Sequence, residues 1–128
     1  FVTVSHSIII GVVAAVVSNL VVLWRTRTNI DDTLDVFPCH GVGGMVGMLM
    51  TGIFASQSVN AANTTGNGLY YGETKLFFAH LIALVVVSLY AFVGAYILLF
   101  ITNAISPLRV LPEDEEIGLD KSQHDEEL

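Results

Sequence analysis

Residues 31–44 read Asp31-Asp32-Thr33-Leu34-Asp35-Val36-Phe37-Pro38-Cys39-His40-Gly41-Val42-Gly43-Gly44. Three carboxylates lead directly into an uncharged apolar stretch, and a histidine follows a few residues later. Hydrocarbon solvates ionisable groups poorly, so a histidine inside a membrane span is a candidate functional residue. The glycines after His40 leave space beside its imidazole ring. The segment therefore predicts a polar pathway through a membrane, with His40 lining it.

The composition of the whole chain is typical of a membrane protein. Hydrophobic residues make up 53% of the 128 residues and charged residues only 13%, and the mean hydropathy is +0.68. The stretches 1–24, 36–56 and 76–108 contain no Asp, Glu, Lys or Arg, and about 20 helical residues are enough to cross the hydrocarbon of a bilayer. We expect an all-α integral membrane protein with transmembrane helices at about 5–24, 38–56 and 76–105. A soluble helical bundle is the alternative.

The start of the second helix is set by a proline. A residue before proline avoids the helical region, so Phe37 is disfavoured as a helical residue. Proline itself suits the first turn of a helix. The second helix is therefore expected to begin at Pro38, which places His40 in its first turn. The three aspartates before it are most simply caps for this helix or partners for the arginines that follow the first span.

The distribution of charge predicts the orientation in the membrane. Arg25 and Arg27 follow the first span, Arg109 and Lys121 follow the third, and only Lys75 lies in the other loop. The positive-inside rule then places the 25–35 loop and the C-terminal tail in the cytoplasm. Residues 1–108 form the transmembrane portion, and residues 109–128 form an acidic tail with eight of the twelve Asp and Glu residues. The net charge of −7 is thus concentrated in the tail, which disfavours nucleic acid and anionic lipid as partners.

The chain contains a single cysteine, Cys39, which excludes an internal disulfide and a cysteine-based zinc cluster. We expect no metal and no cofactor. The chain begins with Phe1 and has no signal-peptide pattern. We therefore expect it to be a fragment whose upstream part is missing.

Residues 31–55 resemble the penultimate transmembrane segment of the ammonium transporter (Amt/Mep/Rh) family, Amt branch. The tail resembles that branch's cytoplasmic C-terminal region over Glu115-Glu116-Ile117-Gly118-Leu119-Asp120-Lys121-Ser122-Gln123-His124-Asp125-Glu126. The resemblance implies the last three helices of an eleven-helix ammonium-channel fold, followed by the tail. It also implies ammonium or ammonia transport by a homotrimer in the cell membrane, with the C-terminus in the cytoplasm.

The same resemblance assigns roles in the pore. His40 corresponds to the second of two pore histidines, whose rings touch edge to edge in a narrow hydrophobic channel and relay a proton. Val36 corresponds to a wall residue on the cytoplasmic side of that histidine, and Asp35 to an acid near the cytoplasmic mouth. The family more often has Gly-Val where this chain has Pro38-Cys39.

The resemblance also assigns a regulatory role to the tail. Gly118, Leu119 and Asp120 would fold against the cytoplasmic face of the adjacent subunit and offer a dock for a PII-type signalling protein. Ser122 stands where plant relatives have a regulatory threonine, and an added phosphate would introduce negative charge. His124 matches the family's tail motif.

Several alternatives stay open from the residues. His40 could be a structural histidine between helices, as we expect for His6 and His80. The protein could be an ammonium sensor with little flux. It could also be a membrane enzyme that uses Asp35, Cys39 and His40 as a nucleophile and base, although adjacent helical residues point in different directions. Transport without enzymatic activity is the function that the sequence favours.

Overall fold

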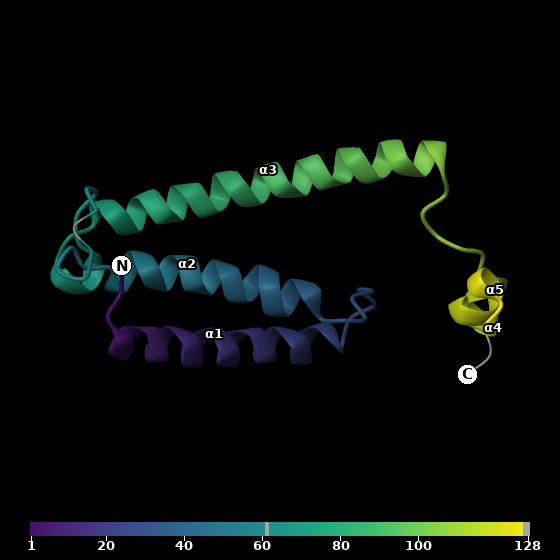
Figure 1. The fold of residues 1–128 in the computed structure, drawn as a ribbon, viewed down its shortest axis with the longest axis horizontal. Coiled ribbons are helices and arrows are strands. Elements are labelled where there is room, and N and C mark those ends of the chain that lie inside the picture. The colour runs from purple at the N-terminus through teal and green to yellow at the C-terminus, as the bar shows by residue number, and fades with distance from the viewer. Residues whose placement is uncertain (61, 127–128) are drawn as a thin grey trace. The chain divides into compact units, whose positions relative to one another are not determined.

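The computed structural model describes residues 1–60 and 62–126, and all regular structure within these ranges is helical (Figure 1). Helix α1 covers Val4–Arg25, and α3 covers Lys75–Ile105. Between them, the π-helical segment η1, Phe37–Val42, continues directly into α2, Gly43–Phe54. Within the described ranges, α1, the joined η1 and α2, and α3 are each long and apolar enough to cross a membrane. The predicted all-α class with three spans is confirmed.

The chain forms two compact units, one ending at Val87 and one beginning at Ser88. In the first unit, α1 and α2 lie side by side and run in opposite directions (Figure 1). Pro38 of η1 is fully buried. Gly43 lies so close to α1 that an added Cβ atom would be 3.2 Å from the Ser18 hydroxyl oxygen. Glycine at position 43 therefore leaves room for the Ser18 side chain of α1.

The second helical segment begins at Phe37, one position before the predicted start, and its first six residues are π-helical. The cause lies in Asp32, whose two carboxylate oxygens accept hydrogen bonds from the Val36 and Phe37 amides at 2.9 Å each. Because these amides are satisfied by a side chain, the helix can begin before Pro38, which has no amide hydrogen to offer. The segment ends at Phe54, where residue 56 was expected.

The loop after α2 folds back on the end of that helix. The Gly68 amide donates to the Ala55 carbonyl at 2.8 Å, and the short 3₁₀ helix η2, Leu69–Tyr71, follows. Ala55, Ser56 and Asn63 are buried. The Asn63 side-chain amide donates to the Gly66 carbonyl at 2.6 Å, so this polar residue is satisfied inside the loop.

Histidines join the elements of this unit. The His80 Nδ1 atom on α3 lies 2.8 Å from the Met48 carbonyl oxygen on α2. His6 on α1 stacks on Phe54 with ring centroids 4.5 Å apart, and Tyr70 meets it edge to face at 5.2 Å. Both histidines therefore pack between elements, as the sequence predicted.

The second unit contains the rest of α3 and two short tail helices. Helix α4, Pro112–Ile117, and helix α5, Leu119–His124, pack against each other. Gly118 lies between them with a φ of +100°, a backbone conformation that side chains disfavour. The Ser122 hydroxyl donates to the Asp114 carbonyl at 3.3 Å, which joins the two helices.

Candidate functional site

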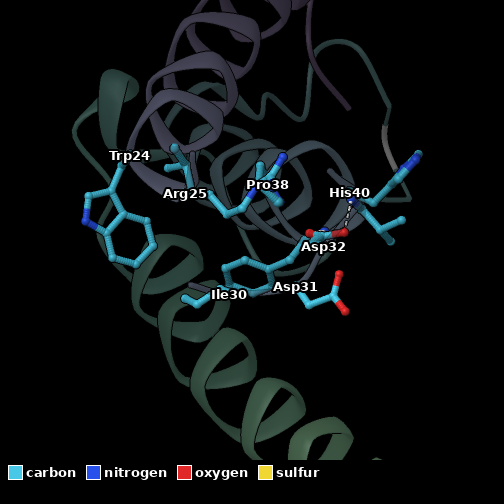
Figure 2. A pocket seen from close by; sticks show the side chains of 11 residues that line it. Trp24, Arg25, Ile30, Asp31, Asp32, Pro38 and His40 are labelled. Carbon is cyan, nitrogen blue, oxygen red and sulfur yellow. Dashed lines mark hydrogen bonds between the residues drawn. The ribbon is translucent and has the colours of Figure 1, made fainter. Parts of the chain in front are cut away.

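His40 lies in η1 with an exposed side chain, and its ring makes no hydrogen bond within the described residues. It lines a hollow of about 540 Å³ together with residues of α1, the following loop and η1. Figure 2 shows Trp24 and Ile30 on one side of this hollow and His40 on the other, with Asp31 and Asp32 between them. An unpaired imidazole at the edge of a hollow can both donate and accept a hydrogen bond.

Most of the surface that lines the hollow is apolar. Val36, Phe37 and Pro38 contribute to it from the second span, and Trp24 contributes from the end of α1. The polar groups are Arg25, the Asp31 and Asp32 carboxylates, and the ring of His40. A small molecule in such a space meets apolar walls and a few polar groups near the loop, an arrangement common in small-molecule sites.

The loop between α1 and η1 is held by an ion pair. The Nε atom of Arg25, the last residue of α1, donates to the Asp35 carboxylate at 3.1 Å, and the guanidinium Nη2 contacts the same oxygen. Both side chains are partly buried, with exposed fractions of 21% for Arg25 and 28% for Asp35. Asp35 has a φ of +52°. Asp32 is thus a cap and Asp35 an ion-pair partner, the two roles that the sequence offered for these aspartates.

The structure brings two of the three predicted pore residues together. Val36 and His40 line the same hollow, whereas Asp35 is not among the residues that line it and faces Arg25 instead. Arg25 and Pro38 also line the hollow, but they were not predicted as site residues. Their signals were weak, because an arginine after a span is an ordinary interfacial residue and a proline is an ordinary helix start.

The nucleophile and base of the enzyme alternative are not brought together. Cys39 lines a different hollow, between α1 and the second span, which also includes Ser18 and Asn19. His40 lines the hollow described above, so the two side chains face separate spaces. Among the described residues, no group of three or more His, Cys, Asp and Glu side chains could hold a metal ion.

The predicted regulatory residues all lie in the tail helices or between them. Gly118 separates α4 from α5, and Leu119, Asp120, Ser122 and His124 belong to α5. Leu119 is exposed despite being apolar. The tail therefore presents an acidic surface with an exposed leucine, and the Ser122 hydroxyl donates a hydrogen bond within it.

Comparison with known proteins gives a match along the entire chain. The family model described as the Ammonium Transporter Family matches residues 1–128. The Ammonium transporter Amt1 of Archaeoglobus fulgidus is 39% identical over 126 residues, and the Ammonium transporter of Bacillus subtilis is 36% identical over 131. The Ammonium transporter of Aquifex aeolicus is 37% identical over 127 residues. Each alignment covers 98% of this chain, but the chain spans only 31% of the first two relatives and 29% of the third.

Proposed function

The chain belongs to the Ammonium Transporter Family, and from this premise we propose that it works in ammonium or ammonia transport across the cell membrane. The observation that supports the proposal most strongly is the family match over all 128 residues. The three apolar helices support it too, because they make the protein a multi-pass membrane protein. The proposal extends to a homotrimer whose C-terminal tail lies in the cytoplasm.

The chemical problem of such a transporter is the cost of dehydrating a cation. Moving an ammonium ion into a medium of low dielectric is far more costly than moving neutral ammonia, which has no net charge to desolvate. A selective pathway can therefore remove a proton from ammonium and pass ammonia between apolar walls. Alkali ions have no proton to give up, so the same desolvation cost excludes them.

We assign the proton-handling role to His40. A neutral imidazole has one donor and one acceptor nitrogen, so it can accept a proton on one side and release one on the other. The exposed, unbonded ring of His40 and its position beside an apolar hollow support this role. A second histidine, from a part of the transporter outside residues 1–128, would complete the relay. Val36 would form part of the apolar wall, and Asp35 would lie near the cytoplasmic mouth.

The test is methylammonium uptake by the full-length transporter in cells that lack their own ammonium carriers. The His40→Ala variant is expected to lose uptake while its abundance and its trimer assembly stay unchanged. The matched control is His80→Asn, which removes another histidine of a span but keeps a side-chain amide in position to donate to Met48. We expect this control to keep most of the uptake.

The two possible failures have different meanings. Unchanged uptake in His40→Ala would make His40 a structural residue and would overturn the relay. Absence of uptake from the wild type and from every variant would instead favour the ammonium sensor.

We further propose that α4 and α5 form a regulatory tail, in which Gly118, Leu119 and Asp120 contact the neighbouring subunit and a PII-type protein. The acidic charge of α4 and the exposed Leu119 support a docking surface for a basic, partly apolar partner. Pull-down of a PII protein by the full-length transporter, with and without residues 112–126, tests this docking.

A further inference from the structure

We propose that Arg25 and Asp35 form a positioning pair for His40, and that Asp35 is not a free charge that attracts ammonium. This inference rests on the proposed function, because it assigns a task to Asp35 within the same site. The pair joins the last residue of α1 to the turn that immediately precedes η1. Its task is to hold this turn in the one conformation that starts the π-helical segment and places the His40 ring beside the hollow.

The backbone of Asp35 has a conformation that is unusual for a residue with a side chain. Its φ of +52° lies in the left-handed region, which costs free energy for a residue with a side chain but is tolerated best by Asp and Asn. Such a conformation persists only where the surroundings enforce it, and it often marks a functional segment. Here the guanidinium of Arg25 contacts the Asp35 carboxylate through two nitrogen atoms and can supply that constraint.

The backbone of Asp35 is also bonded to the first turn of the helical segment. The Asp35 carbonyl accepts from the Cys39 amide at 3.0 Å, so this residue sets the first turn of the helical segment. His40 is the next residue after Cys39. A change in the Asp35 backbone would therefore rotate or loosen the turn that holds His40 and would move its imidazole ring directly.

The Asp35 carboxylate faces Arg25 and does not line the hollow. Val36 and His40 line the hollow, but Asp35 does not, and its negative charge is compensated by Arg25. A carboxylate paired with a guanidinium presents little net field to a passing cation. Nearby Asp31 and Asp32 do line the hollow, so negative charge at its edge does not depend on Asp35.

The two possible roles of Asp35 predict opposite effects of neutralising Arg25. If Asp35 attracts ammonium, the Arg25→Gln variant frees a negative charge and lowers the KM for uptake. If the pair positions His40, Arg25→Gln damages transport in the same way as Asp35→Ala and lowers the maximal rate.

The experiment measures KM and maximal rate of methylammonium uptake by the full-length transporter at equal abundance. We expect Arg25→Gln and Asp35→Ala each to lower the maximal rate several-fold with little change in KM. The double variant should be no worse than either single variant, because coupled residues are not additive. Asp35→Asn should retain more activity than Asp35→Ala, because asparagine tolerates the left-handed backbone and keeps an oxygen for Arg25. The control is Arg27→Gln, whose arginine makes no ion pair within the described residues.

A second measurement does not depend on transport. Hydrogen–deuterium exchange of the peptide that includes residues 35–42 should be faster in Arg25→Gln and Asp35→Ala than in the wild type, and unchanged in Arg27→Gln. Unchanged exchange in Arg25→Gln, or a lower KM in that variant, would overturn the positioning pair. A wild type without uptake would overturn the proposed function instead, and the exchange data would still decide the role of the pair.

Discussion

The Nδ1 atom of His80 lies 2.8 Å from the carbonyl oxygen of Met48, and this contact joins α3 to the helix that holds His40. A carbonyl can only accept a hydrogen bond, so the Nδ1 atom of His80 bears a hydrogen and donates it. His80 is thus a packing histidine whose ring is held by a hydrogen bond, in contrast to the unbonded ring of His40.

Replacement of His80 by phenylalanine should destabilise the full-length protein by about 1 kcal/mol, the order of a hydrogen bond between membrane helices. Phenylalanine keeps a ring of similar size but cannot donate to Met48. Thermal unfolding of the solubilised protein measures the effect, and His80→Asn should recover part of the lost stability. Equal thermal unfolding midpoints for the wild type and His80→Phe would mean that this hydrogen bond contributes nothing to stability.

The close approach of α3 to α2 also depends on Gly52, which is buried. An added Cβ atom there would lie 3.2 Å from the Phe77 Cα atom and 3.3 Å from the His80 Cβ atom. Gly52→Ala should therefore push α3 away from α2 and cost about 1–3 kcal/mol, as overpacking usually does. The control is Gly94→Ala on α3, where nothing lies within 4 Å of the added atom. If both variants unfold at the same temperature, the close approach at Gly52 is not a determinant of stability.

The three spans could be predicted from the sequence because charge is nearly excluded from hydrocarbon. Three long stretches without Asp, Glu, Lys or Arg were enough to place the helices. The start of the second span was less predictable. The rule for residues before proline considers only neighbours, whereas the Asp32 carboxylate reaches forward to the Val36 and Phe37 amides and allows an earlier start.

The candidate site was predictable in part. Val36 and His40 do lie at one hollow, and their roles in transport stay a prediction. The conformation of Asp35 could not be read from the sequence, because it depends on how closely the end of α1 approaches the loop and on the contact with Arg25. The stacking of His6 on Phe54 is likewise a contact between residues far apart in the chain, and periodicity does not predict such contacts.

Gly118 joins the two tail helices in a backbone conformation that favours glycine. Its φ of +100° and ψ of 137° end α4 and begin α5. A Cβ atom there would meet no neighbour, so Gly118→Ala tests the backbone conformation alone. We expect it to destabilise the packing of α4 on α5 by about 1 kcal/mol or more.

Limited proteolysis of the tail in the full-length protein measures this change as faster cleavage within residues 112–126. Gly72→Ala is a useful comparison, because Gly72 also has a positive φ, of +85°, with no neighbour near the added atom, but lies outside the tail. It should leave cleavage of the tail unchanged. If the tail of Gly118→Ala resists proteolysis as well as the tail of the wild type, the predicted role of this glycine is contradicted.

Ser122 joins α5 to α4 and is the residue of the tail at which an added charge would act. Its hydroxyl donates to the Asp114 carbonyl at 3.3 Å, in a segment that also contains Glu113 and Glu115. An aspartate at position 122 cannot donate and would bring a negative charge toward an oxygen acceptor and an acidic helix. Ser122→Asp should therefore loosen α5 from α4 and change methylammonium uptake, whereas Ser122→Ala loses only the hydrogen bond, at a cost under about 1 kcal/mol. Tail cleavage and methylammonium uptake are measured on the wild type, Ser122→Asp and Ser122→Ala, so that an effect on tail structure is separated from an effect on transport. Faster cleavage with unchanged uptake would leave the tail structure sensitive to charge but would remove its proposed control of transport.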